Sequence, residues 1–175
     1  MYPQAYIDYL HYFHCERDYF ECHEVLEEHW KEKEANEREL YWVGLIQIAV
    51  GLYHYRRGNF NGAKRMLTNA ISIIRTHTNE IESLALDSKS LIELLENQLA
   101  GIERQDSYMS IDLPLTDETL LTSCKTRARN ENLIWGAPSD LQNKSLVHRH
   151  STRNRDDVIQ ERLAQLMKRQ QKKEG

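Results

Sequence analysis

Fourteen consecutive residues without a charge, Leu40 to Tyr53, constrain the fold of this chain more than any other feature. The run is too long for an ordinary strand and contains no turn signal, so its length favours a helix. Its apolar residues point in every direction around such a helix, which is typical of a helix buried in a core or in a membrane. At ~1.5 Å per residue the run spans roughly 21 Å, short of the ~30 Å hydrocarbon layer. We therefore expect a buried central helix over about 40–57 and no membrane partner.

The rest of the chain carries the signals of an all-α protein. Its 175 residues include only seven Gly and three Pro, and runs of β-branched residues are few. Apolar residues recur with helical spacing, so we expect a compact multi-helix bundle around the central helix. The other expected helices cover about 3–15, 19–34, 60–77, 88–104 and 116–128, with a break at Thr78-Asn79 and a short extended piece at Leu146–His150.

Charge divides the chain into an acidic body and a basic end. Residues 1–124 contain 11 Lys+Arg and 21 Asp+Glu, a net charge of −10, whereas residues 125–175 contain 12 and 6, a net charge of +6. Such an asymmetry indicates a tail that packs on the body, binds a second chain or meets an anionic partner. We expect a helical core domain, an extended segment with a short helix that packs on the core, and a basic C-terminal segment with one amphipathic helix from near Asn154 (1–104, 105–128 and 129–175).

Cysteine usage and the N-terminus bear on the compartment. Cys15, Cys22 and Cys124 are odd in number and show no CxxC spacing. This pattern predicts reduced structural thiols. The chain begins with no basic-then-apolar leader, so a cytoplasmic protein is expected.

Two polar residues of the second expected helix occupy positions where apolar residues would be expected. On its helical wheel, His23 and Glu27 fall in the middle of the apolar face. A carboxylate in a core is costly unless it is paired, and His23 is near enough to pair with it. Gln47 and His54 share one face of the central helix with two glycines and are the expected counterparts. These four residues form a candidate buried cluster.

Three interpretations of this cluster stay open. The favoured one is a buried hydrogen-bond network that fixes the register of the helices. The second is a divalent metal site, for zinc or iron, made by His23, Glu27 and His54, and no other cofactor is predicted. The third is an acid–base pair or another binding pocket. Glu27 stands where an HExxH motif would have its second histidine, and no partner Glu-x-x-His motif supports a di-iron bundle.

The other histidines and the basic end are assigned to the surface. His11, His14, His29 and His77 are expected to be exposed or partly exposed. A basic patch follows near the C-terminus, formed by His148, Arg149, His150, Arg153 and Arg155. This patch is expected to be solvated or paired within the chain, and the alternative is contact with an anionic partner through residues 144–155.

Two segments together carry a family resemblance. ECHEVLEEHW at 21–30 and GLIQIAVGLYHYRRGNFNGAKRML at 44–67 resemble a family of small helical proteins from bacteria and archaea that is catalogued as domain of unknown function number 309. The resemblance covers about residues 3–77, and IDLP at 111–114 loosely resembles a later segment of the family. It implies an all-helical domain built on the first four helices, and it implies no activity.

Residues 47–75 also resemble a single tetratricopeptide unit. The small-residue positions of that unit are matched by Gly51, Ala63 and Ala70, and its turn by Gly58-Asn59-Phe60, but its aromatics and proline are replaced by Gln47, His54 and Arg75. No copy recurs about 34 residues away, so a repeat array is not expected. The prediction is a tight helical hairpin that packs through small residues.

The most favoured function is a binding or interaction module, with a protein partner or a second copy of the chain. In this interpretation the His/Glu/Gln cluster is structural. The alternatives are a metal-binding protein or metal-dependent enzyme that uses His23, Glu27 and His54, and a nucleic-acid-binding protein that uses the basic tail. An enzyme is less favoured than a binding protein.

Overall fold

Helices make up the regular structure of this protein. The computed structural model describes residues 1–149, 164, 167–169 and 171. Within that part of the chain the only β pairing is a single bridge between Leu86 and Leu115, which confirms the all-α class. The helices are α1 (Gln4–His14), α2 (Tyr19–Lys31), the 3-10 turn η1 (Ala35–Glu37), α3 (Leu40–Arg56), α4 (Phe60–Thr76), α5 (Thr78–Ser83), α6 (Ser88–Glu103), α7 (Glu118–Asn130) and α8 (Lys144–Val147).

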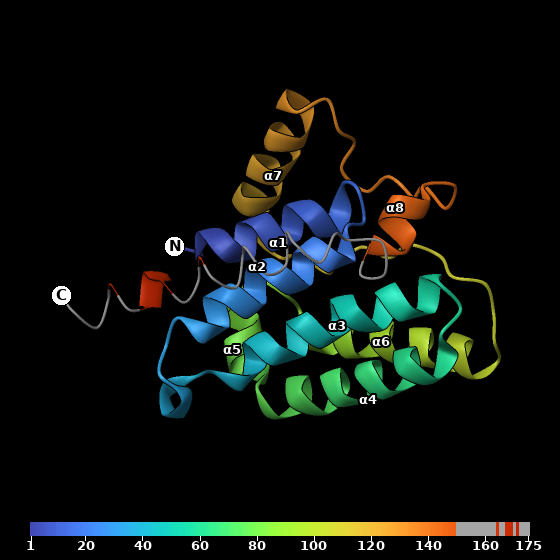
Figure 1. Ribbon diagram of the computed structural model, residues 1–175, viewed down its shortest axis with the longest axis horizontal. Helices are drawn as coiled ribbons and strands as arrows, with labels where there is room; N and C mark the ends of the chain where they lie inside the picture. The colour runs from blue at the N-terminus through green and yellow to red at the C-terminus, as the bar shows by residue number, and fades with distance from the viewer. Residues whose placement is uncertain (150–163, 165–166, 170, 172–175) are drawn as a thin grey trace.

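The charge-free stretch forms α3, the helix on which the bundle is built (Figure 1). It packs against α2 on one side and α4 on the other, while α1 packs on α2 and α6 packs on α4. Residues on all sides of α3 are therefore buried, among them Trp42, Leu45, Ile48 and Leu52. This confirms the predicted central helix, because contacts on every side satisfy an all-round apolar surface.

Small residues set the close approach of α3 and α4. A Cβ added at Gly51 would lie 2.8 Å from Cδ2 of Leu67, and one added at Gly44 would lie 3.0 Å from Cγ2 of Ile73. The turn between the helices passes through Gly58, whose φ of +79° is a left-handed conformation suited to glycine. Asn59 then caps α4 by accepting a hydrogen bond from the Gly62 amide at 3.1 Å. The tetratricopeptide likeness of this hairpin stays a prediction.

Two short helices differ from the expected elements. The chain turns at His77, but α5 follows immediately where the sequence predicted only a break. The expected extended piece at Leu146–His150 is also wrong, because residues 144–147 form α8. Asn143 explains the difference, since its side chain accepts a hydrogen bond from the Leu146 amide and starts a helical turn.

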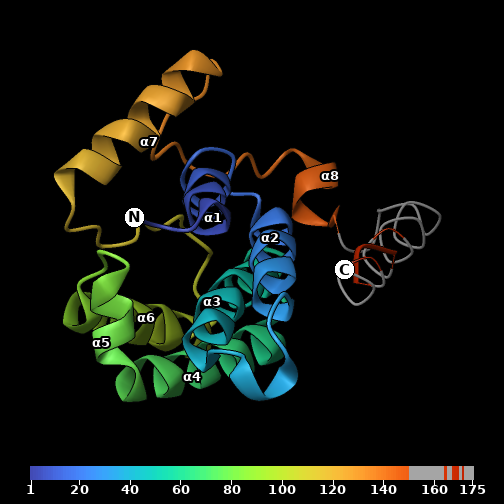
Figure 2. The same ribbon diagram turned by 90° about the vertical axis from the view of Figure 1, so that its left-hand side faces the viewer.

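The segments after α6 lie over the α1–α2 side of the bundle. Figures 1 and 2 both show α7 beyond α1, on the far side from α4, and α8 beside α1 and α2. Tyr2 donates a hydrogen bond to Asp117 at 2.6 Å, and His14 accepts one from the Leu113 amide at 3.0 Å. The helix expected from near Asn154 falls largely outside the described residues. Among the residues that are described, no helix is long and apolar enough to cross a membrane.

Candidate functional site

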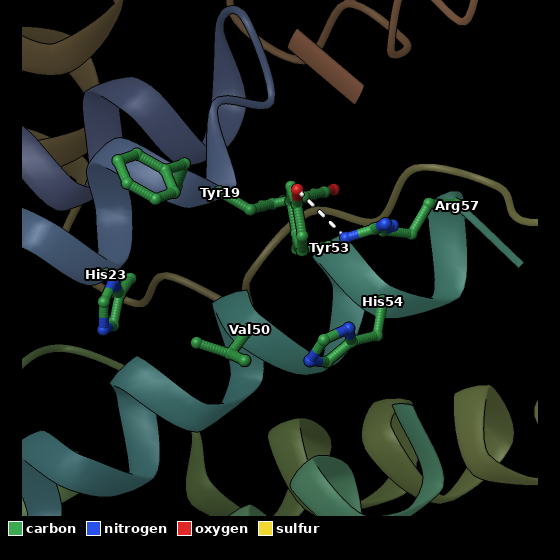
Figure 3. A pocket seen from close by; sticks show the side chains of 7 residues that line it. Tyr19, His23, Val50, Tyr53, His54 and Arg57 are labelled. Carbon is green, nitrogen blue, oxygen red and sulfur yellow. Dashed lines mark hydrogen bonds between the residues drawn. The ribbon is translucent and has the colours of Figure 1, made fainter. Parts of the chain in front are cut away.

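A pocket of about 200 Å³ opens between α2 and α3 (Figure 3). Figure 3 shows His23 reaching it from α2, and Val50 and His54 facing it from α3. The lining is mostly carbon, with basic side chains at its edges. The seven lining residues are Tyr19, Phe20, His23, Val50, Tyr53, His54 and Arg57.

The wall from α2 is fixed at its first turn. Asp18 caps the helix by accepting a hydrogen bond from the Glu21 amide at 3.2 Å. The next residue, Tyr19, is fully buried, and its hydroxyl lies 2.5 Å from that of Tyr108. The guanidinium of Arg56 lies 4.7 Å from the centre of the Tyr19 ring, a cation–π contact. These contacts hold the Tyr19 ring in one position.

The wall from α3 combines an apolar side chain with polar groups near the end of the helix. Arg57 donates a hydrogen bond of 3.4 Å to the Tyr53 hydroxyl and lies 5.4 Å from the centre of that ring. His54 is half-buried, with Nδ1 3.2 Å from the side-chain nitrogen of Asn59. Val50 lies between these polar groups and His23 (Figure 3). Val50 thus presents an apolar surface to the pocket, between polar groups on either side.

His23 is held between two carboxylates at the rim of the pocket. Its Nε2 lies 2.6 Å from Glu27, and its Nδ1 lies 3.3 Å from Glu24. Burial opposes the charged imidazolium, but the hydrogen bonds to Glu24 and Glu27 outweigh it and raise the pKa of His23 to about 9. The hydrogen bond from His23, and then the one from Lys31, lowers the pKa of Glu27 to about 2. With both ring nitrogens donating, His23 has no lone pair for general-base chemistry at neutral pH.

The structure corrects the predicted cluster in two respects. His23 and Glu27 do form an i,i+4 pair, but their side chains are 28% and 31% exposed, so the prediction of a buried pair is wrong. The buried face of α2 is centred on Tyr19, Cys22 and Leu26, which places His23 at its edge and Glu27 further out. The sequence interpretation left Cys22 out of this face although a free cysteine behaves as a small apolar side chain.

Gln47 was predicted to belong to the cluster and Glu24 was not, and the structure shows the reverse. Gln47 lies between Gly44 and Gly51 on the face of α3 that meets α4, and it is not among the residues that line the pocket. Glu24, expected to face solvent away from the cluster, forms an ion pair with His23.

The three predicted metal ligands do not lie together. The ligand atoms that lie within 4.8 Å of one another belong to His23, Glu24 and Glu27. His54 shares the pocket with His23 but is not in this group. The predicted His23–Glu27–His54 metal set is therefore not brought together.

The basic patch is only partly described. Arg149 forms an ion pair with Asp18, whose side chain is 2% exposed, and His148 follows the last turn of α8. His150, Arg153 and Arg155 lie outside the described residues. For Arg149, pairing within the chain is the observed arrangement. Contact of residues 144–155 with an anionic partner stays a prediction.

The sequence interpretation missed a second polar group, formed around His14 and Arg17. His14 is fully buried and Arg17 is 1% exposed, although His14 was expected near the surface. Arg17 donates to the carbonyls of Ile111 and Ala137 and pairs with Asp112 at 2.7 Å. An adjacent pocket of about 280 Å³ includes Arg17 and the hydroxyls of Tyr108, Ser110 and Ser139, which bond one another. These polar groups hold the loops in place.

Cys15, His11 and Glu131 are arranged like the nucleophile, base and acid of a catalytic triad. Cys15 Sγ lies 3.7 Å from Nδ1 of His11, and Nε2 of His11 lies 2.6 Å from Glu131. Burial raises the pKa of the Cys15 thiol to about 11, and the residue is 5% exposed. A reactive thiol needs a lowered pKa and access to its substrate, so we interpret this group as structural. His11 was also expected at the surface, but it is buried at 5% exposure.

Comparison with known proteins places the pocket within a recognised segment. A sequence model of the family described as "Domain of unknown function (DUF309)" matches residues 6–66. The uncharacterized protein YpuF of Bacillus subtilis (strain 168) is 47% identical over 174 residues, which is 99% of this chain and 100% of that protein. No solved structure matches the chain. All seven residues that line the α2–α3 pocket fall within the matched segment.

Proposed function

Because the chain belongs to the family described as a domain of unknown function (DUF309), and the matched segment contains the whole lining of the α2–α3 pocket, we propose that this pocket is the functional site. The function is that of a binding module. The pocket receives an apolar side chain presented by a protein partner. The observation that carries this proposal is the open, mostly apolar pocket itself.

The size of the pocket supports a side chain as its occupant. At about 200 Å³ it is smaller than the roughly 300–1,000 Å³ of ordinary small-molecule sites. A single large apolar side chain fits such a volume, and its burial contributes about 1.5–3 kcal/mol. This is the size of contribution made by an anchor residue at a protein interface.

The rim of the pocket supports a partner surface that is partly polar. On one side, His23 is paired with Glu24 and Glu27, and on the other Arg57 lies over Tyr53. An apolar centre with a polar, hydrogen-bonded rim is the usual anatomy of a protein interface. In this proposal the His23 network is structural, since it fixes the orientation of a ring that forms part of the wall.

Filling the pocket tests the proposal. Anilinonaphthalene sulfonate serves as a small aromatic probe whose fluorescence reports entry into apolar sites. Val50→Phe is expected to weaken saturable probe binding at least ~10-fold, or about 1.4 kcal/mol, because the ring occupies the space the probe needs. Val50→Ala, which enlarges the same space, is expected to retain binding.

The matched control places the same residue type in the other pocket. Met109→Phe adds a ring to the pocket beside Arg17 and is expected to leave probe binding unchanged. Thermal melting of each variant checks that the fold is intact. Equal affinities of the wild type and a folded Val50→Phe variant would remove the α2–α3 pocket as the binding site.

A second candidate function, divalent metal binding, is favoured by one observation. His23, Glu24 and Glu27 each offer a ligand atom, and these atoms lie within 4.8 Å of one another. Imidazole and carboxylate are common ligands of zinc and iron. To bind there, a metal would have to replace the proton between His23 and Glu27. It would also have to break the ion pair between Glu27 and Lys31.

Zinc titration of tag-free protein by calorimetry tests this candidate. If the three residues bind zinc, His23→Ala and Glu24→Gln are each expected to weaken binding by at least about 10-fold, because each removes a ligand, and loss of a mere outer-shell partner of a ligand already costs about 10- to 100-fold. His54→Ala is the control and is expected to leave zinc affinity unchanged, because His54 is outside the group. Zinc affinity that survives His23→Ala would reject the site.

A further inference from the structure

The pocket beside Arg17 is separate from the α2–α3 pocket, and the two share no lining residue. Arg17 reaches it from the turn between α1 and α2, and the other lining residues belong to segments 108–112 and 136–141. Its volume of about 280 Å³ lies just below the roughly 300–1,000 Å³ of ordinary small-molecule sites. A pocket of this size suits a compact ligand.

An ion pair in this pocket has one buried and one exposed partner. The side chain of Arg17 is 2% exposed and that of Asp112 is 61% exposed, and Oδ1 of Asp112 lies 2.7 Å from Nη2 of Arg17. Within the described part of the chain, Arg17 is the only hydrogen-bond partner of this carboxylate. The second carboxylate oxygen of Asp112 is therefore open to a donor from outside the chain, and an ammonium group is the donor that its charge favours.

Three hydroxyl groups lie on another side of the pocket. They belong to Tyr108, Ser110 and Ser139, and their oxygens are between 2.9 and 3.3 Å apart. Arg56, which is 8% exposed, donates a hydrogen bond to Oγ of Ser139 at 3.3 Å, so a buried positive charge lies directly behind the hydroxyls. Each O–H can rotate toward an incoming acceptor. Hydroxyl donors backed by a positive charge are a favourable environment for a carboxylate.

The rim of the pocket is apolar. Met109 is 75% exposed and Leu141 is 54% exposed, and Pro138 lines the pocket with them. Large apolar side chains that are exposed together mark a binding surface more often than isolated ones do. An apolar part of a ligand would be partly covered by these side chains.

We infer that this pocket binds a free α-amino acid with an apolar side chain. The ammonium group of the ligand bonds to Asp112, its carboxylate meets the three hydroxyls in front of Arg56, and its side chain lies against Met109 and Leu141. Each part of such a ligand then faces a group of matching chemistry. The inference is independent of the proposed function, because it concerns a different pocket.

Calorimetric titration of the full-length wild-type protein with three small probes tests this inference. L-leucine is expected to bind saturably at one site per chain. Isopentylamine lacks the carboxylate of leucine and 4-methylpentanoate lacks its ammonium group, so each is expected to bind at least ~10-fold more weakly, the usual cost of losing one charged hydrogen bond. Absence of saturable L-leucine binding, or equal affinity for all three probes, would overturn the inference.

Two variants locate the site. Asp112→Asn keeps an acceptor for Arg17 but removes the negative charge, and it is expected to weaken L-leucine binding at least ~10-fold. Asp140→Asn is the matched control, an exposed change of the same type outside the pocket, and is expected to leave the affinity unchanged. Leu141→Glu, at an exposed position of the rim, is expected to weaken binding several-fold and serves if Asp112→Asn does not fold.

The Val50→Phe variant separates this inference from the proposed function. If it loses L-leucine binding while Asp112→Asn retains it, leucine enters the α2–α3 pocket and the inference is overturned, but the proposed function stands. If L-leucine binding depends on Asp112 and Val50→Phe has no effect on anilinonaphthalene sulfonate, the inference stands and the proposed function fails.

Discussion

Replacement of Arg17 by methionine is expected to lower the free energy of unfolding by about 4 kcal/mol. The Arg17 side chain is 2% exposed and joins three segments that are distant in sequence. It donates to the Ile111 carbonyl, to the Ala137 carbonyl at 2.8 Å, and to Asp112 at 2.7 Å. Methionine fills a similar volume but donates nothing, and each buried carbonyl left without its donor costs about 1–3 kcal/mol.

Chemical denaturation followed by circular dichroism measures this loss. Arg17→Lys is expected to have an intermediate effect, because an ammonium group keeps the charge but cannot make the fork of three hydrogen bonds. Arg129→Met, an exposed change of the same type at the end of α7, is expected to stay within about 0.5 kcal/mol of the wild type. A loss below about 1 kcal/mol for Arg17→Met would show that the loops are held by other contacts.

Lowering the pH from about 7 to 4 is expected to destabilise the protein by about 3 kcal/mol through His14 alone. Burial lowers the pKa of His14 from its ordinary value of 6.5 to about 4, so the folded state keeps it neutral while the unfolded state takes up a proton. The hydrogen bonds of its two ring nitrogens explain why the neutral form is favoured. Nδ1 donates to the Leu10 carbonyl at 2.8 Å and Nε2 accepts from the Leu113 amide at 3.0 Å. If Nε2 were protonated, its N–H would face the N–H of Leu113, and two hydrogen-bond donors would meet without an acceptor.

The direction of the effect follows from proton uptake. Between pH 6.5 and 4 the unfolded state binds more protons at this position, so stability falls as the pH falls through that window. Carboxylates titrate in the lower part of the same range, so the comparison is made with His14→Gln. This variant is expected to be less stable at pH 7, where the stacked contact of His14 with Trp135 is lost, and to have a flatter pH profile. Parallel profiles for the two proteins would contradict the assignment to His14.

Local patterns were enough to predict the helical bundle. The absence of charge from Leu40 to Tyr53 predicts α3, and helical spacing predicts α1, α2, α4 and α6 to within a few residues. Such patterns depend only on neighbours a few positions apart. The α5 and α8 helices are each a single turn or little more, too short to show a period.

Only some residues of the candidate site could be predicted, because only some of them stand out in a local sequence pattern. His23 and His54 were singled out because each is polar within an apolar run, and both line the α2–α3 pocket. Tyr53 and Arg57 gave no such signal, since an aromatic and a basic residue are ordinary at the end of a helix. The burial of His14 and Arg17 was not predictable, because their partners lie between 94 and 120 residues away in the chain.

The ion pair between Asp18 and Arg149 bears on the order in which the chain is completed. Asp18 is 2% exposed, and its partner is 131 residues later in the sequence. Burial raises the pKa of Asp18 although the Glu21 amide and Arg149 favour its charged form. During synthesis, α1 and α2 emerge long before Arg149, so the N-cap of α2 meets this countercharge only when most of the protein has been made. The segment that the family shares thus depends, for one of its buried charges, on a residue outside it.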